Sequence, residues 1–181
     1  MDNGASSYRR FLDGDESAFE DIMKELFHGL VFFIDGFVCD THAAEDIAID
    51  TFSDLVVHRN RYNFKVSLKT YLYMVGRSRA LDYIKHRKVI DFVELSESLA
   101  DETAALEEII LADERKRKVN VALAKLPGDM RGVVHLVYFE EMTYEEAAKV
   151  MKKNRKQVDN LLYRAKKELR IVLGKDGELL L

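Results

Sequence analysis

The segment from Thr143 to Leu173 decides the fold, and it reads TYEEAAKVMKKNRKQVDNLLYRAKKELRIVL. Thr143 can cap the start of a helix, and Glu146, three residues later, completes a capping-box pattern. Apolar side chains recur at helical spacing through Met151. The polar triplet Lys152-Lys153-Asn154 follows, and asparagine tolerates the left-handed backbone that a tight turn needs. The pattern predicts a short helix that ends in a turn, with Asn154 as the left-handed residue.

A second helix with two unlike faces follows this turn. Its apolar face carries Val158, Leu161, Leu162, Ala165, Leu169 and Val172. Its polar face is mostly basic and carries Arg155, Lys156, Gln157, Asp159, Asn160, Tyr163, Arg164, Lys166 and Lys167. A short helix, a tight turn and a basic second helix are typical of a DNA-reading helix-turn-helix. In such a helix Arg and Lys contact guanine edges or phosphates, and Asn and Gln contact adenine.

The charges of the 181-residue chain are unevenly distributed, although the net charge is only −4. Residues 149–173 contain nine basic and two acidic side chains, and residues 77–90 contain five and one. Between them, residues 91–114 contain nine acidic side chains and no basic one. Charge blocks of this size indicate interaction surfaces, so the acidic average does not exclude a nucleic-acid binder. An ordinary solvated helix face is the alternative for either basic block.

Composition and periodicity predict an all-α chain. Apolar residues make up 48% of the sequence, and the single proline and nine glycines are too few for a turn-rich sandwich or barrel. A first helix is expected from near Asp15, where Ser17 and Glu20 form a second capping-box pattern. A loop is expected over 60–65, and Ser67 can cap a long helix that continues to about Lys88.

Between these two helices, a further helix is expected over about 42–58. Its apolar side chains Ile47, Phe52, Leu55 and Val56 would face the core, and its opposite face carries Glu45, Asp46, Asp50 and Asp54. Residues 1–90 are therefore expected to form one helical bundle, and the acidic residues 91–114 a linker that runs into the next helix. That helix, from about 104 to 125, would end at Leu126-Pro127-Gly128, and another would follow over about 128–140.

The fold class predicted is thus two small helical domains, 1–90 and 115–173, joined by the acidic linker and followed by a tail over 174–181.

The basic block 77–90 follows four aromatic residues, Tyr62, Phe64, Tyr71 and Tyr73. Rings beside a basic helix suit single-stranded nucleic acid, because bases stack on the rings while Lys and Arg follow the phosphates. The alternative is that these rings pack in the core, as aromatic residues on helices usually do.

Several function classes are disfavoured. One cysteine, Cys39, excludes a disulfide framework, and we expect it to be a small buried side chain. The five histidines form no metal-binding motif, and no phosphate loop or nucleophile motif is present, so we expect no enzyme, no cofactor and no metal. The longest apolar run is far shorter than the roughly 20 residues of a membrane span, and the start has no signal-peptide pattern, so we expect a cytoplasmic protein without membrane insertion.

Taken together, these blocks resemble bacterial RNA polymerase sigma factors of the extracytoplasmic-function (ECF) type. The segment 44–52 resembles the polymerase-binding helix of sigma region 2, and 64–88 resembles its promoter −10 segment. Four further segments, 126–127, 138–140, 143–148 and 163–169, resemble region 4. Three positions depart from the family pattern: Tyr71 replaces a common tryptophan, Ser78 a common asparagine, and Lys152-Lys153-Asn154 the usual Gly-apolar-Ser turn.

The resemblance implies an alternative sigma factor whose partners are core RNA polymerase, promoter DNA and an anti-sigma factor. It implies a core-polymerase contact through Glu45, Asp46, Asp50 and Asp54. It implies −10 contacts through Phe64, Tyr71, Arg77, Ser78, Arg79, Lys85, His86, Arg87 and Lys88. It implies −35 contacts through Arg155, Lys156, Gln157, Asp159, Asn160, Tyr163, Arg164 and Lys167. It also implies that the acidic linker lies along the polymerase channel for template and RNA.

Two other classes remain open. One is a sigma-like helix-turn-helix regulator that acts without core polymerase, and the other is an adaptor that binds another protein through its acidic surface. Neither needs both the acidic face of 45–54 and the basic block 77–88.

Overall fold

A computed structural model describes residues 4–94 and 114–173, and describes side chains over 4–87 and 119–173. Within these residues all regular structure is helical, as the sequence predicts. The chain divides into two compact units, 1–94 and 95–181, and each is described by itself. Of the linker predicted over 91–114, residues 91–94 continue the helix that begins at Leu68, and Glu114 begins another helix. Residues 95–113 and the predicted tail 174–181 lie outside the described residues.

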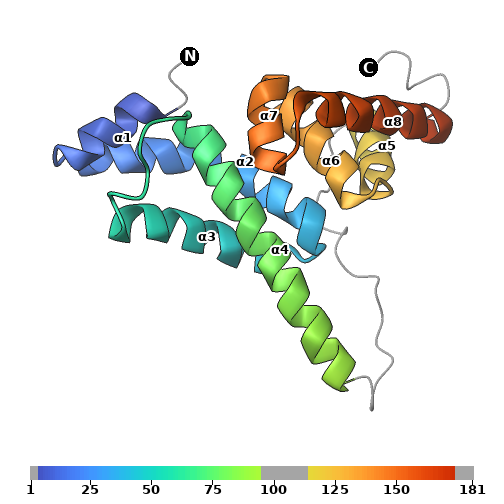
Figure 1. Ribbon diagram of the computed structural model, residues 1–181, viewed down its shortest axis with the longest axis horizontal. Helices are drawn as coiled ribbons and strands as arrows, with labels where there is room; N and C mark the ends of the chain where they lie inside the picture. Colours follow the sequence, from blue (N-terminus) through green and yellow to red (C-terminus); the bar gives the residue numbers. More distant parts are fainter. Residues whose placement is uncertain (1–3, 95–113, 174–181) are drawn as a thin grey trace. The chain divides into compact units, whose positions relative to one another are not determined.

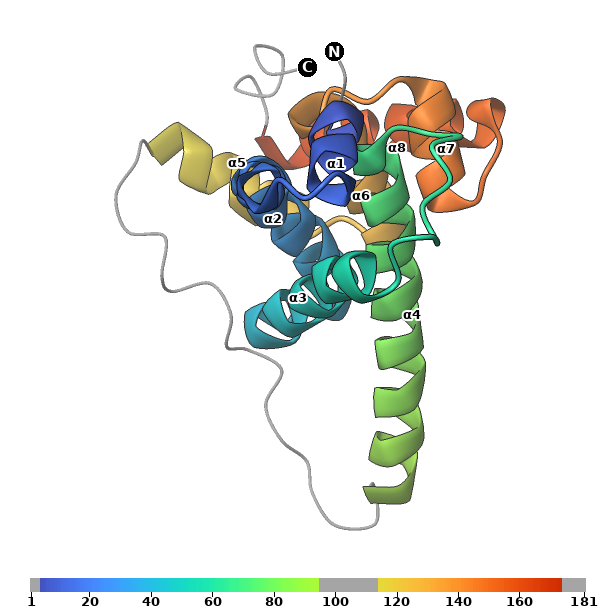
Figure 2. The ribbon, with the colours of Figure 1, turned by 90° about the vertical axis from the view of Figure 1, so that its left-hand side faces the viewer.

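The first unit contains α1 (Ala5–Leu12), α2 (Glu16–Val38), α3 (Thr41–Val57) and α4 (Leu68–Glu94) (Figure 1). Helix α2 is central and packs against the other three. Its buried side chains Leu30, Phe33 and Ile34 meet a core that includes Phe52 of α3 and Leu72 of α4. Figures 1 and 2 both show the C-terminal part of α4 continuing beyond α2 and α3.

Helix α1 was not predicted, and it closes one end of this bundle. Tyr8 of α1 is fully buried, and its hydroxyl donates to the carbonyl oxygens of Leu55 at 2.9 Å and Arg59 at 3.2 Å. Phe11 is buried beside Phe19 of α2, with ring centroids 5.0 Å apart. Eight residues with only two buried side chains give too little periodicity to identify a helix from sequence.

The starts of α2 and α4 differ in how well the sequence predicts them. The N-cap of α2 is Asp15, so the predicted Ser17–Glu20 capping box is wrong. The Ser17 hydroxyl donates instead to the Asp15 carboxylate at 2.6 Å, and this bond, with Arg10, lowers the pKa of Asp15. Ser67 does cap α4, because its hydroxyl oxygen accepts the Thr70 N–H at 3.1 Å.

Helices α2 and α3 meet at a sharp corner. Cys39 ends α2 in the left-handed conformation, with φ 54°, and its side chain is exposed. The expectation that Cys39 is buried is therefore wrong, because a residue at such a corner points outward. Asp40 caps α3, where its carboxylate accepts the Ala43 N–H at 3.1 Å.

The second unit contains α5 (Glu114–Ala124), α6 (Gly128–Val134), the π-helical turn η1 (His135–Phe139), α7 (Tyr144–Met151) and α8 (Arg155–Leu173). Helices α5, α6 and α7 each pack against α8. The fully buried Leu136, Met151 and Leu162 are part of its core. The predicted break at 126–128 is present, with Pro127 as the N-cap of α6.

The helix predicted over 128–140 is a continuous α-helix only to Val134. From His135 it widens into the π-helical turn, where the Glu140 N–H bonds to the His135 carbonyl oxygen at 3.1 Å. The ring of His135 stacks on Phe139, with centroids 5.6 Å apart, and its Nε2 lies 3.2 Å from Glu140. Periodicity cannot distinguish this extra-residue turn from an α-helix over five residues.

Candidate nucleic-acid and polymerase surfaces

The hairpin of α7 and α8 has the geometry that the sequence predicts, except at its turn. Thr143 and Glu146 form the capping box, with Glu146 N–H to Thr143 Oγ1 at 3.2 Å and Thr143 N–H to Glu146 Oε2 at 2.9 Å. The left-handed residue is Lys152, with φ 51° and ψ 45°, and not Asn154. Asn154 instead caps α8, where its Oδ1 accepts the Gln157 N–H at 2.8 Å.

The polar face of α8 is open to solvent. All eight residues predicted to contact the −35 element are exposed: Arg155, Lys156, Gln157, Asp159, Asn160, Tyr163, Arg164 and Lys167. On the apolar face Val158, Leu162, Ala165 and Leu169 are buried and Leu161 is half-buried. Val172 is 43% exposed, so the core ends one turn before the sequence predicts. A cationic helix face of this kind can follow phosphates while its N-terminal residues reach base edges.

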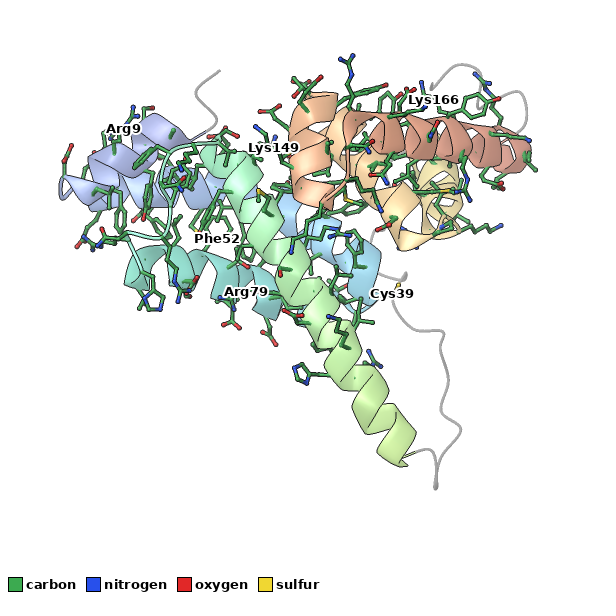
Figure 3. The ribbon with its side chains drawn as sticks, in the orientation of Figure 1. Arg9, Cys39, Phe52, Arg79, Lys149 and Lys166 are labelled. Carbon is green, nitrogen blue, oxygen red and sulfur yellow. The ribbon has the colours of Figure 1, made fainter. Side chains whose placement is uncertain are left out.

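Two side chains of this face are held within the hairpin. Arg155 lies 3.1 Å from Glu145 of α7, and Gln157 Oε1 accepts the Asn154 N–H at 2.9 Å. Lys166, at the edge of the face, lies over the Tyr138 ring at 5.1 Å from its centroid (Figure 3). The exposed ring of Tyr163, at 72%, stands among the cations of α8.

The acidic face of α3 divides into two parts. Glu45, Asp46 and Asp50 are exposed, and the side chain of Asp50 is 70% accessible. Asp54 is only 16% accessible, and both of its oxygens accept from Arg61 Nη1 at 2.8 Å. Three acidic side chains of this set are therefore exposed, and the fourth is mostly covered within the unit.

The basic block on α4 is also not uniform. Arg77 is buried, at 7%, and lies over the Phe37 ring at 5.7 Å, so packing in the core removes it from the predicted −10 set. Ser78 and Arg79 are half-buried, and Lys85, His86 and Arg87 are exposed. Figure 3 shows Arg79 where α4 passes α3, and there it lies 3.7 Å from Asp54 and 4.0 Å from Asp50. The side chain of Lys88 lies outside the described ones.

The four aromatic residues that precede the basic block, two in the loop and two in α4, fit neither interpretation alone. Tyr62 and Tyr73 are buried and belong to the core, whereas Phe64 and Tyr71 are half-buried. Tyr62 lies between them, with its centroid 4.6 Å from that of Phe64 and 5.1 Å from that of Tyr71. Burial raises the pKa of Tyr71, and the nearby Asp54 carboxylate raises it further.

Sequence reasoning missed two basic side chains at this cluster. Arg9 of α1 lies over Phe64, 4.9 Å from the ring centroid (Figure 3), and Arg61 pairs with Asp54. The alternation Arg59-Asn60-Arg61-Tyr62-Asn63-Phe64 was a signal for Arg61, because basic residues interleaved with rings suit nucleic acid. Arg9 had no such signal, since its helix was not predicted.

Within the described residues, no group of His, Cys, Asp and Glu side chains could hold a metal ion. None of the helices described there is both long and apolar enough to cross a membrane.

Two family models match the chain, one in each unit. The model of sigma-70 region 2 matches residues 30–89, and the model of sigma-70 region 4 matches residues 116–169. The first match covers the C-terminal part of α2, all of α3 and most of α4, and the second runs from α5 into α8.

Curated proteins of similar sequence are RNA polymerase sigma factors. The ECF RNA polymerase sigma factor SigM of Bacillus subtilis is 28% identical over 138 residues, which cover 75% of this chain and 83% of SigM. The RNA polymerase sigma-H factor of Pseudomonas aeruginosa is 27% identical over 169 residues, which cover 86% of each chain. The ECF sigma factor SigW of Bacillus subtilis is 26% identical over 171 residues, 87% of this chain and 89% of SigW.

Solved structures show the same fold at low identity. The sigma factor RpoE of Bartonella quintana, solved in complex with the anti-sigma factor NepR, matches with a TM-score of 0.72 at 18% identity. That match covers 87% of this chain and 98% of RpoE. The two sigma-70 region models and the curated relatives agree across both units. The chain therefore belongs to the sigma-70 family and is an alternative sigma factor of the extracytoplasmic-function group, which binds core RNA polymerase and directs it to promoters.

Proposed function

We propose that this sigma factor binds promoter DNA and core polymerase through three separate surfaces. One lies on α8, one lies on α3, and one is formed by α4 with the preceding loop. The observation that carries the proposal is their charge arrangement: cationic faces on α8 and α4, and an anionic face on α3. A stand-alone DNA regulator would need only the first of these surfaces.

The surface on α8 is proposed to read the −35 element. Lys156, Asn160 and Arg164 stand on one exposed strip near the start and middle of the helix, where side chains can reach base edges in the major groove. The remaining cations would neutralise phosphates and set the register of the helix on DNA.

The exposed part of the α3 face is proposed to bind core polymerase. Glu45, Asp46 and Asp50 would meet a basic surface of the polymerase clamp, and complementary charge would speed their encounter and fix its orientation.

The surface of α4 and the loop before it is proposed to hold the melted −10 strand. Phe64 and Tyr71 would provide faces for stacking, and Lys85, His86 and Arg87 would follow the phosphates along α4. Stacking is worth about 1–3 kcal/mol per base, which is comparable with the few kcal/mol that it costs to extract a base from the duplex.

Three further proposals follow from membership in the group. The protein acts in the cytoplasm, it has no catalytic activity of its own, and an anti-sigma factor binds it and holds it inactive. The partner proposal draws on solved relatives, since RpoE is in complex with NepR, and CnrH, with a TM-score of 0.66 at 19% identity, is in complex with the cytosolic domain of CnrY.

Run-off transcription with bacterial core polymerase and fragmented host DNA tests the function. Transcript starts that appear only with the protein, and that share two upstream motifs, are expected. The control is core polymerase with a variant in which Lys156, Asn160 and Arg164 are alanine. If no new starts appear while the protein alone still binds DNA, it is instead a regulator that acts without polymerase.

A further inference from the structure

Asp54 stands at the junction of three segments of the first unit. It lies near the end of α3, its carboxylate binds Arg61 of the following loop, and it lies 3.7 Å from Arg79 of α4. His58 Nε2 lies 3.5 Å from the same carboxylate. Two arginines, one from the loop and one from α4, and the imidazole of His58, which directly follows α3, therefore converge on one acidic group.

Burial separates Asp54 from the other acidic residues of its helix. Its side chain is 16% accessible, whereas that of Asp50, one turn earlier on the same face, is 70% accessible. A carboxylate that already accepts from a guanidinium and is largely covered has little capacity to meet an external partner. Sequence periodicity places both residues on one face, and only their surroundings distinguish them.

The segments that Asp54 joins carry the proposed −10 surface. Arg61 directly precedes Tyr62, whose ring lies between Phe64 and Tyr71 and whose hydroxyl donates to the Val66 carbonyl oxygen at 2.7 Å. Arg79 lies on α4, two turns after Tyr71. The Asp54 carboxylate thus fixes the start of the aromatic loop and a cation of α4 relative to α3.

We propose that Asp54 is a positioning residue for promoter opening, which holds the 58–67 loop and Arg79 in the arrangement that receives the −10 strand, and is not a contact for core polymerase. This inference rests on the proposed −10 role of the loop and α4. One guanidinium nitrogen, Arg61 Nη1, lies 2.8 Å from both oxygens of the Asp54 carboxylate, and Arg79 approaches the same group at 3.7 Å. Charge-assisted hydrogen bonds are shorter and stronger than neutral ones, so this contact can hold the loop against α3.

The test compares Asp54→Asn with the control Asp46→Asn in the full-length protein. Asp46 is exposed on the same helix, whereas Asp50 lies 4.0 Å from Arg79 and belongs to the same cluster as Asp54. Two quantities are measured for each: affinity for core polymerase, and opening of a promoter found by run-off, followed with a fluorescent base analogue at −10. For Asp54→Asn we expect opening on duplex promoter to fall about tenfold, with core affinity within about twofold of the original. For Asp46→Asn we expect the reverse pattern, with the main loss in core affinity.

If only the charge of Asp54 mattered, Asp54→Asn would favour DNA binding and promoter opening and not reduce them. Removing a negative charge beside a DNA-binding surface should strengthen DNA binding, because phosphates would meet less repulsion. A loss of opening therefore cannot come from the charge change itself. Equal loss of core affinity in both variants, or unchanged opening in Asp54→Asn, would overturn the inference.

Two further variants distinguish a positioning role of Asp54 from a general loss of structure. Asp54→Glu keeps the carboxylate and is expected to recover most of the opening. Adding Arg61→Gln to Asp54→Asn is expected to cause no further loss, because both changes break the same pair. Additive losses, or an Asp54→Glu variant that folds yet opens no better than Asp54→Asn, would also overturn the inference. If the unaltered protein opens no promoter with core polymerase, the proposed function fails and not this role of Asp54.

Discussion

Asn154 and Gln157 cap the first turn of α8 reciprocally. Asn154 Oδ1 accepts the Gln157 N–H at 2.8 Å, and Gln157 Oε1 accepts the Asn154 N–H at 2.9 Å. Two backbone donors at the start of a helix are satisfied in this way. Bidentate recognition of adenine needs the amide oxygen of glutamine as well as its nitrogen, so Gln157 can read a base in that manner only if the cap opens.

Gln157→Ala is therefore expected to weaken region 4 rather than to change which promoters are used. The variant loses the bond from the Asn154 N–H to Gln157 Oε1 and keeps the Asn154 cap, so the free energy of unfolding should fall by about 0.5–1.5 kcal/mol. Chemical denaturation, followed by circular dichroism, measures this change. Transcription from promoters that differ at −35 should fall by a similar factor on each; a change in their rank order would show that Gln157 reads sequence.

Lys156→Ala serves as the contrasting variant at the neighbouring position. Its side chain is exposed, and the proposed role is contact with a base edge. The ratio of activities on two promoters with different −35 sequences is expected to change, by roughly 1–3 kcal/mol in discrimination energy at one base pair. A uniform loss on every promoter would mean that Lys156 contacts phosphate alone.

Asp46→Lys is expected to slow the association of the protein with core polymerase. Asp46 is exposed on α3, and reversing its charge would replace attraction to a basic surface with repulsion. The effect should appear mainly in the association rate and should shrink as salt rises. Rapid-mixing fluorescence at low and high salt measures it. Asp21→Lys, at an exposed position of α2, is the control; an equal effect there would indicate non-specific steering.

Lys85→Ala is expected to reduce the salt dependence of −10 strand binding. The Lys85 side chain is 79% accessible, and its ammonium group lies 3.9 Å from the exposed Asp82 on the same helix. Loss of one phosphate contact to a single strand should lower the slope of log K against log salt by roughly 0.7. Titration of the assembled holoenzyme with a fluorescent −10 oligonucleotide gives the slope. Lys24→Ala, at an exposed position of α2, should leave the slope unchanged.

The strongest periodic elements could be predicted from the sequence. Helices α3, α7 and α8 begin and end close to the predicted residues, because each has a capping residue and a regular apolar stripe. Helix α1 could not be predicted, since it is short and its anchor, Tyr8, depends on carbonyl groups that lie 47 and 51 residues later in the chain. Likewise, Ser17 loses its expected capping role to Asp15, which Arg10 of the unpredicted helix holds in place.

On the candidate surfaces too, some features could be predicted from the sequence and others could not. A helical wheel identifies which residues share a face, and so the exposed side of α8 and the acidic side of α3 were predictable. It does not indicate what crosses over that face. Asp54 is covered because the chain returns with Arg61 and Arg79, and Arg77 is buried because Phe37 of α2 lies against it. Both outcomes depend on contacts between distant segments.

Tyr8→Phe tests the anchor of α1. The variant removes a buried hydroxyl that donates to two carbonyl oxygens, and it is expected to lower the free energy of unfolding by about 1 kcal/mol at neutral pH. Burial raises the pKa of Tyr8, so the folded state favours the protonated phenol. Its contribution is therefore fully present below the unfolded pKa of about 10 and is lost as pH rises through the folded pKa.

Denaturation measured below and above about pH 10 tests whether the contribution of Tyr8 to stability is lost as pH rises. The unaltered protein should lose stability in the alkaline range more steeply than Tyr8→Phe. Part of the loss should persist in the variant, because burial also raises the pKa of Tyr71. Identical pH profiles for the two proteins would show that the Tyr8 hydroxyl does not couple to folding.

Gly76→Ala tests how closely α4 must approach α2. A Cβ atom at this position would lie 2.9 Å from Leu30 Cδ1 and 3.2 Å from Ile34 Cδ1. Alanine is favoured over glycine within a helix by about 1 kcal/mol, whereas overpacking a core costs about 1–3 kcal/mol. Because Leu30 and Ile34 are fully buried and have little room to move, the overpacking should dominate and the protein should be less stable.

The same substitution should also affect function through Arg79, which follows Gly76 by one helical turn. A displaced α4 would move Arg79 away from Asp54, so promoter opening should fall more than core affinity. Adding Leu30→Val shortens the nearest side chain, and the double variant should be more stable than the sum of the two single changes predicts. If Gly76→Ala instead raises the melting temperature, the helices can separate without strain, and the close packing of α4 on α2 is not what holds Arg79 beside Asp54.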